Sequence, residues 1–136
     1  MQDLKQSFLS ELDNDPNRQV LSYIADKSAH SGISEVLRAS VKPLGDVQIY
    51  SPDWPKYQYV VASTEHVIFA FAIGENSIAF RLNRTYMERA LATGGAPFPP
   101  CGENWVTFMP FRTDWPRIDF QFWALKAYEC ARKTGD

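Results

Sequence analysis

The chain has 136 residues, of which 45% are hydrophobic and 22% are charged. This length and composition are typical of one globular domain with its own core, and they exclude an intrinsically disordered chain. The formal net charge of −2 argues against sequence-independent binding to nucleic acid, which normally requires a basic surface.

The amino-terminal third, residues 1–45, has the pattern of helices. Apolar residues at helical spacing predict a first helix over residues 2–13, which the turn at Pro16 ends. A second helix is expected to run to about His30, with Asp15 or Asn17 as its cap. A third, short helix is expected from about Ser34, ending before Pro43 and Gly45.

From Asp46 onward the hydrophobic pattern alternates with a period of two, which predicts strands. Five strands are expected, and the third and fourth form an antiparallel hairpin. They are Val47–Ile49, Tyr57–Val61, His66–Ile73, Ser77–Leu82 and Trp105–Phe111. A helix over residues 84–92, stopped by Gly94 and Gly95, and a closing helix over residues 117–133 complete the pattern.

This order of elements predicts an α+β fold, a mainly antiparallel five-stranded sheet with the amino-terminal helices and the carboxy-terminal helix packed on it. Residues 1–136 are expected to form a single domain. Strict alternation in the hairpin predicts one bulky face, with Phe69, Phe71 and Ile73 beside Ile78, Phe80 and Leu82. The opposite face is expected to be shallow and to carry these residues: Ile68, Ala70, Ala72, Ser77, Ala79 and Arg81.

The part from Tyr57 to Arg132 resembles the small bacterial YjbR and TfoX-amino-terminal-like domains. The resemblance depends on the hairpin Val67–Leu82, a following helix, a Gly/Pro loop leading to Asn104-Trp105-Val106-Thr107, and a final amphipathic helix. It implies an α+β fold with a DNA-binding or protein-binding role. It carries no catalytic motif that could be transferred to this chain.

No constellation for catalysis is recognisable in the sequence. Cys101 would need a nearby base such as His66 or His30 to act as a nucleophile, and a loop thiol without a partner is the alternative. The spacing of histidines and cysteines matches no metal site, and the glycines form no phosphate-binding motif. We therefore expect no catalytic residue, no metal and no cofactor.

The candidate binding residues come from two features. Two Asp-Trp-Pro turns contain Trp54, Asp114 and Trp115, and prolines stiffen such turns so that an exposed Trp can act as a contact residue. Arg81 on the shallow face, with Arg112 near a strand end, could bind a carboxylate or phosphate. The competing interpretations are core tryptophans and solvated surface charges.

Three functions are compatible with these features. The first is a non-enzymatic binding protein of the immunity, adaptor or regulatory type, whose partner is another protein. The second is a small-molecule binder or enzyme that uses the shallow face with Arg81 and Arg112, and the third is a DNA-binding YjbR-like domain. The sequence shows no signal peptide and no run of about 18 apolar residues, so a cytoplasmic protein with two free thiols and no membrane contact is expected.

Overall fold

The computed structural model describes residues 12–52, 58–110 and 118–134. Its helices are α2 (Asp15–Ile24), α3 (Ser31–Val41), α4 (Arg84–Ala92) and α5 (Phe120–Thr134), with a 3₁₀ turn η1 (Pro99–Cys101). Its strands are β1 (Gln48–Tyr50), β2 (Val60–Thr64), β3 (Val67–Ile73), β4 (Ser77–Arg81), β5 (Ala96–Pro97) and β6 (Trp105–Phe108). The predicted α+β class is confirmed, and the helix expected over residues 2–13 lies almost wholly outside the described residues.

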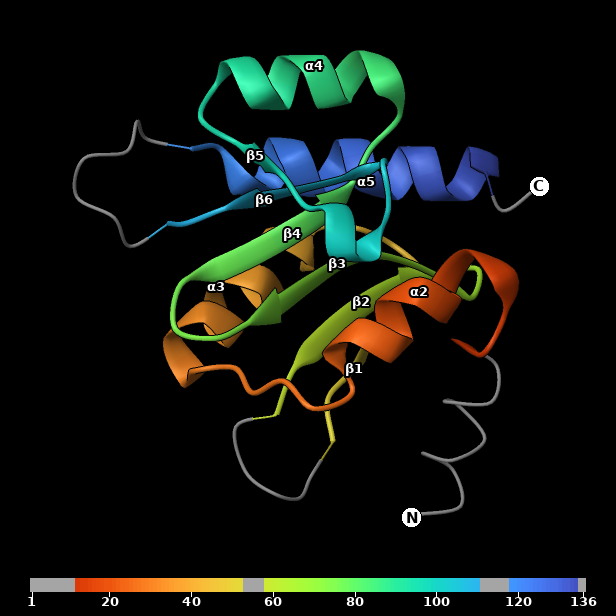
Figure 1. The fold of residues 1–136 in the computed structure, drawn as a ribbon, viewed down its shortest axis with the longest axis vertical. Coiled ribbons are helices and arrows are strands. Elements are labelled where there is room, and N and C mark those ends of the chain that lie inside the picture. Colours follow the sequence, from red (N-terminus) through yellow and green to blue (C-terminus); the bar gives the residue numbers. More distant parts are fainter. Residues whose placement is uncertain (1–11, 53–57, 111–117, 135–136) are drawn as a thin grey trace.

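The strands form one antiparallel sheet in the order β1-β2-β3-β4-β6-β5 (Figure 1). The sheet has six strands rather than the five predicted, because two residues of the proline-containing loop, Ala96 and Pro97, pair with Thr107 and Val106 of β6. The hairpin of β3 and β4 is central, as predicted, and every residue of β3 is buried.

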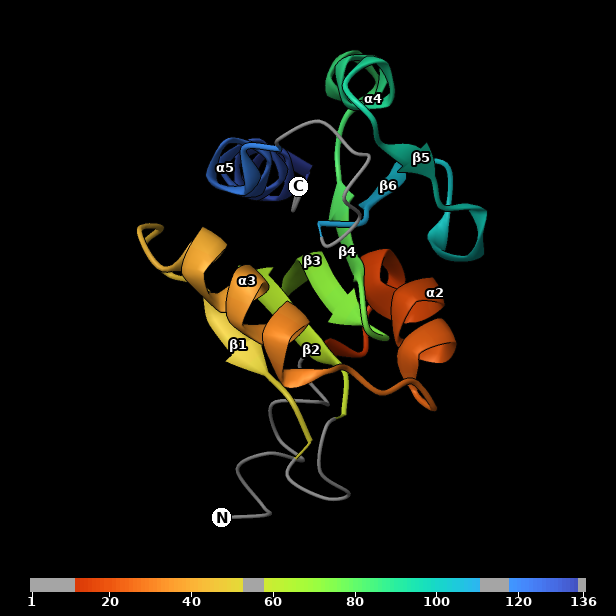
Figure 2. The same ribbon diagram turned by 90° about the vertical axis from the view of Figure 1, so that its left-hand side faces the viewer.

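Helices cover both faces of this sheet. Figure 2 shows α3 and α5 on one side of the sheet and α2 on the other, with α4 beyond the end that carries β5 and β6. One core lies under α3 and α5 and includes Phe69, Phe80 and Phe108. A second core lies under α2 and includes Ile24, Phe71 and Trp105.

A β-bulge in β3 makes the predicted assignment of faces wrong. Ala62 pairs with Ala70 and the next residue, Ser63, pairs with Ile68, so that Phe69 is the extra residue of the bulge. Because of the bulge, Phe69 and Ala70 share the core under α3 and α5, and Phe71 and Ile73 turn to the core under α2.

The cross-strand register confirms this correction. Phe71 is paired with Ala79 and Ala70 with Phe80, so large and small side chains alternate on each face. The shallow face of small side chains that the sequence predicted therefore does not exist, because the three-residue turn after β3 pairs Ile73 with Ser77 and so sets Ala72 opposite Ile78.

The amino-terminal helices begin and end at other residues than predicted. Asn14 caps α2, its side chain accepting a hydrogen bond from the Asn17 amide, and the helix ends at Ile24 instead of His30. The intervening Ser28 and Ala29 form bridges with Gln58 and Gly74, and backbone that is paired in this way cannot continue a helix. The third helix, α3, begins at Ser31, after His30, whose side chain accepts from the Gly32 amide.

Helix α4 has the predicted bounds, and Gly95 explains how closely its end approaches the sheet. The Gly95 amide donates to the Ala90 carbonyl at 2.9 Å. A Cβ atom at residue 95 would lie 2.7 Å from Cγ2 of Val106 and 3.1 Å from Cε1 of Phe108. Only glycine lets the chain leave α4 and enter β5 at this distance from β6.

Candidate functional site

Of the five predicted binding residues, only Arg81 lies within the described residues. Trp54, Arg112, Asp114 and Trp115 lie outside them. Arg81 is paired with Trp105 across β4 and β6, and its Nη1 donates to the Pro16 carbonyl at 3.4 Å. Burial lowers the pKa of Arg81, and no described carboxylate lies within ion-pair distance of it.

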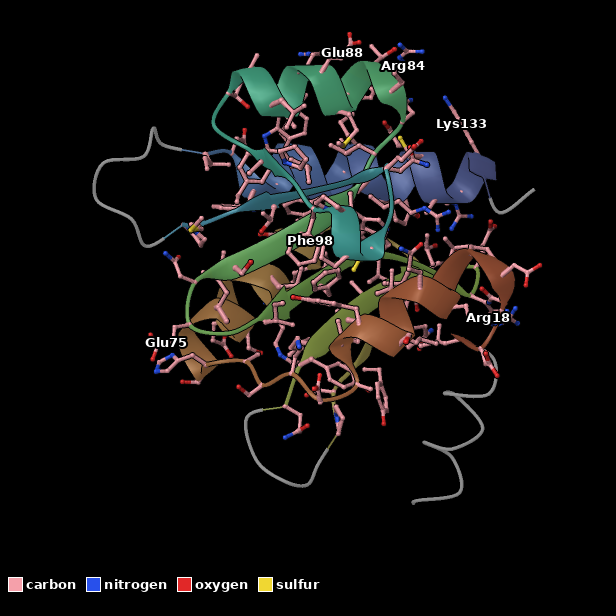
Figure 3. The ribbon with its side chains drawn as sticks, in the orientation of Figure 1. Arg18, Glu75, Arg84, Glu88, Phe98 and Lys133 are labelled. Atoms are coloured by element: carbon pink, nitrogen blue, oxygen red, sulfur yellow. The ribbon has the colours of Figure 1, made fainter. Side chains whose placement is uncertain are left out.

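Arg81 borders a cavity of about 260 Å³ at the end of β4. The other lining residues are Leu82, Asn83, Arg84, Asn104 and Cys130. The side chain of Arg84 is 94% exposed and its Nε lies 3.9 Å from Oε1 of Glu88. Both side chains project from the outer side of α4 (Figure 3), and the charge of Arg84 faces that of Glu88.

Two larger hollows adjoin each other between α2 and η1, and we call them together the α2–η1 groove. One, of about 580 Å³, is lined by Gln19, Pro97, Phe98, Pro99, Gly102, Glu103 and Trp105. The other, of about 720 Å³, is lined by Asp15, Arg18, Gln19, Ser22, Tyr23 and Pro100. Gln19 borders both hollows, and its Nε2 donates to the Pro100 carbonyl at 3.2 Å.

The backbone of the groove is held by hydrogen bonds and by proline. The Phe98 amide donates to the Trp105 carbonyl at 2.9 Å, which fixes the loop to β6. The Cys101 amide donates to the Phe98 carbonyl and the Gly102 amide to that of Pro99, which closes η1. Prolines 97, 99 and 100 restrict φ, so little backbone freedom remains to be lost when a ligand binds.

Aromatic rings form the floor of the groove. Phe98 lies beside η1 (Figure 3), with its ring centroid 5.2 Å from that of Tyr23 and 5.9 Å from that of Phe71. Trp105 packs on Phe71 at 5.1 Å and is 2% exposed. The rings of Phe98 and Tyr23 remain partly exposed, so a ligand in the groove would meet apolar surface in fixed positions.

Charged residues border both hollows of the groove. Arg18 is paired with Asp15, with Nη1 2.9 Å from Oδ1, and projects from the outer side of α2 (Figure 3). Glu103 is exposed, and no described cation lies within ion-pair distance of its carboxylate. The Glu103 carboxylate is therefore available to a positively charged group of a ligand.

The cysteine chemistry considered from the sequence is inconsistent with the structure. Cys101 and Cys130 are buried, and no disulfide joins them. Burial raises the pKa of Cys101 to about 12, so the thiol is protonated at neutral pH and is a poor nucleophile. Nδ1 of His30 accepts a hydrogen bond from the Gly32 amide, and His66 lies in the turn between β2 and β3.

The described residues contain no group of three or more histidines, cysteines, aspartates or glutamates that could hold a metal ion. None of the helices in this part of the chain is long and apolar enough to span a membrane.

Sequence reasoning missed the α2–η1 groove, although one signal for it was present. In Pro97-Phe98-Pro99-Pro100 an aromatic residue is followed by proline, the same feature that drew attention to Trp54 and Trp115. That Gln19 and Tyr23 face this loop depends on contacts between segments that are far apart in the sequence.

Comparison with known proteins adds no family to these observations. No protein-family model, no curated protein and no solved structure matches the chain. The resemblance to the YjbR and TfoX domains therefore stays a prediction.

Proposed function

We propose that this protein is a non-enzymatic binding protein, of the immunity, adaptor or regulatory type, that recognises a partner protein through the α2–η1 groove. The observation that carries the proposal is the groove itself, in which partly exposed aromatic rings lie on backbone that prolines and hydrogen bonds already hold in place. Aromatic residues are enriched at protein interfaces, and a preformed site loses little entropy on binding.

The shape of the groove favours a segment of a protein over a compact metabolite. Its two hollows share Gln19, so a ligand that fills both must extend along the surface past this residue. Glu103 in one hollow suits a lysine or arginine of the partner, and the rings of Tyr23 and Phe98 suit an apolar side chain.

Site-specific photo-cross-linking tests this proposal. A benzoylphenylalanine placed at Ser22, an exposed residue that lines the groove, is expected to cross-link a partner protein in the native cell. The same group at Glu35, an exposed residue of α3 on the other side of the sheet, is the matched control and should give no such product.

The affinity of the purified partner for variants of the groove then shows whether the groove is the binding site. Tyr23→Ser and Glu103→Arg are each expected to weaken the complex about tenfold or more, and Glu35→Arg should leave it unchanged. Equal cross-linking from both positions, or unchanged affinity of both groove variants, would exclude the groove as the binding site.

A small-molecule site at Arg81 is the second candidate. It is favoured by a partly buried guanidinium, without a described carboxylate partner, beside a cavity of about 260 Å³. Native mass spectrometry of the protein purified from its own cell would reveal an anionic ligand, and Arg81→Gln should abolish its retention.

A further inference from the structure

A second surface, on the far side of the sheet from α2, combines aromatic rings with cations. We call it the α4–α5 patch, and it consists of Tyr86 and Arg89 on α4 and Phe122, Leu125 and Lys126 on α5. Figure 2 shows these two helices side by side above α3, away from the α2–η1 groove.

The two cations of the patch both lie over the same two rings. The guanidinium carbon of Arg89 is 5.3 Å from the ring centroid of Tyr86 and 5.6 Å from that of Phe122. Nζ of Lys126 is 5.4 Å and 5.6 Å from the same two centroids. Stacking on two rings restricts the long Arg89 side chain before any partner binds.

The two cations differ in how their charge is balanced. Nζ of Lys126 lies 3.3 Å from Oε1 of Glu129, and the hydrogen bond to Glu129 is the largest cause of the raised pKa of Lys126. Arg89 is exposed, and no carboxylate in the described part of the chain lies within ion-pair distance of it. Its fork of donors is therefore held in place and available to a carboxylate.

Apolar surface adjoins the available guanidinium. Leu125 is 36% exposed, one of two large hydrophobic residues that the described chain leaves exposed. It follows Phe122 by three positions on α5, so the two side chains are neighbours on the helix surface. An apolar side chain of a partner can pack on Leu125 and Phe122 within reach of Arg89.

From this arrangement we infer that the α4–α5 patch is a docking surface for an acidic segment of a partner protein, in which a carboxylate binds Arg89 and a neighbouring apolar side chain packs on Leu125. Arginine and aromatic residues in contact are the residue types most enriched at binding hot spots. The inference is independent of the proposed function, since the patch shares no residue with the α2–η1 groove.

A nucleic acid suits the patch less well. Base stacking needs free ring faces, and the rings of Tyr86 and Phe122 are already contacted by Arg89 and Lys126. The chain as a whole is acidic, with a net charge of −2, and Glu129 is paired with Lys126 of the patch. Phosphate-backbone binding depends on several cations gathered on one face.

The experiment begins with benzoylphenylalanine at Gln121, an exposed residue one turn before Leu125 on α5, in the full chain expressed in its native cell. The expected product is a cross-link to a protein segment, identified by mass spectrometry, that contains acidic and apolar residues. The same group at Asp26, an exposed residue just after α2, is the control position.

The segment is then synthesised as a fluorescent peptide and its affinity is measured by anisotropy. Arg89→Gln should weaken binding about tenfold, Arg89→Lys should restore part of it, and added salt should weaken the wild type more than Arg89→Gln. Arg38→Gln, an exposed arginine on α3, is the matched control and should leave the affinity unchanged.

Four results would overturn the inference. They are a yield at Gln121 no higher than at Asp26, a cross-link to RNA, a cross-link to a second copy of this chain, and an affinity that Arg89→Gln does not change. A thermal melt of Arg89→Gln that matches the wild type shows that any loss of binding does not come from unfolding.

Discussion

The side chain of Asn17 bonds directly to the backbone of the β2–β3 turn, with Nδ2 donating to the carbonyl of His66 at 2.7 Å. Oδ1 of Asn17 accepts a hydrogen bond from the Ile68 amide at 2.8 Å, and Nδ2 also donates to the Leu12 carbonyl at 2.9 Å. Asn17 is fully buried, so its amide joins the start of α2 to the sheet. Nδ2 of Asn14 donates to the same His66 carbonyl at 2.8 Å from an exposed position.

Asn17→Ala is expected to lower the free energy of unfolding by about 3 kcal/mol, since it leaves buried backbone groups without partners. Asn14→Ala, which removes the partly exposed cap of the same helix and an exposed hydrogen bond to the His66 carbonyl, should cost less, about 1 to 2 kcal/mol. Chemical unfolding of both variants measures the difference. Equal losses would show that Asn17 acts only as a helix residue.

The bulge at Phe69 gives the second prediction. Phe71 is fully buried against Phe98 and Trp105 in the core under α2, so Phe71→Ala should cost about 3 to 5 kcal/mol in urea unfolding. A loss below about 1 kcal/mol would contradict this burial. The variant should also loosen the α2–η1 groove, because Phe98 packs on this ring.

How far the sequence predicts this fold depends on whether a feature is local. The bounds of α4 and the central hairpin follow from caps, turns and periodicity within one segment. The bulge, the early end of α2 and the place of Asn17 depend on pairing with residues far away in the chain. No local pattern distinguishes a buried Asn that bonds to the sheet from an exposed helix cap.

The candidate sites show the same limit. Arg81 was found because a charge in an apolar strand is conspicuous, but its neighbours come from α4, α5 and the loop before β6. The α4–α5 patch is assembled from helices separated by the whole of β5 and β6. A sequence shows each half of such a site as an ordinary amphipathic helix.

The buried thiol of Cys101 predicts a loss of stability at alkaline pH. Burial raises its pKa from 9.0 to about 12, so the folded state favours the protonated thiol. This contribution is fully present below about pH 9 and is lost as the pH rises toward 12, because only the unfolded chain then releases its proton readily.

Urea unfolding at about pH 8 and about pH 10.5 measures this effect. The wild type should lose about 2 kcal/mol more than Cys101→Ala between these conditions. Burial also raises the pKa of Tyr50 and Tyr59, so the variant should still lose some unfolding free energy at alkaline pH. An equal loss of unfolding free energy in the wild type and in Cys101→Ala would contradict the buried, protonated thiol.

The last prediction compares two aromatic residues that are each followed by a proline, Trp115 and Phe98. Trp115 lies outside the described residues, and its proposed role comes from the sequence alone, as a contact residue in the Asp114-Trp115-Pro116 turn. Trp115→Ala is therefore expected to weaken the partner complex by about 2 kcal/mol while barely changing the melting temperature. Phe98→Ala should lower both, because the Phe98 ring forms part of the groove and also packs on Phe71 and Tyr23. Calorimetric titration with the cross-linked partner and thermal melts of both variants separate the two roles. If Trp115→Ala lowers the melting temperature by several degrees and leaves the affinity unchanged, Trp115 belongs to the core and the predicted role in binding is wrong.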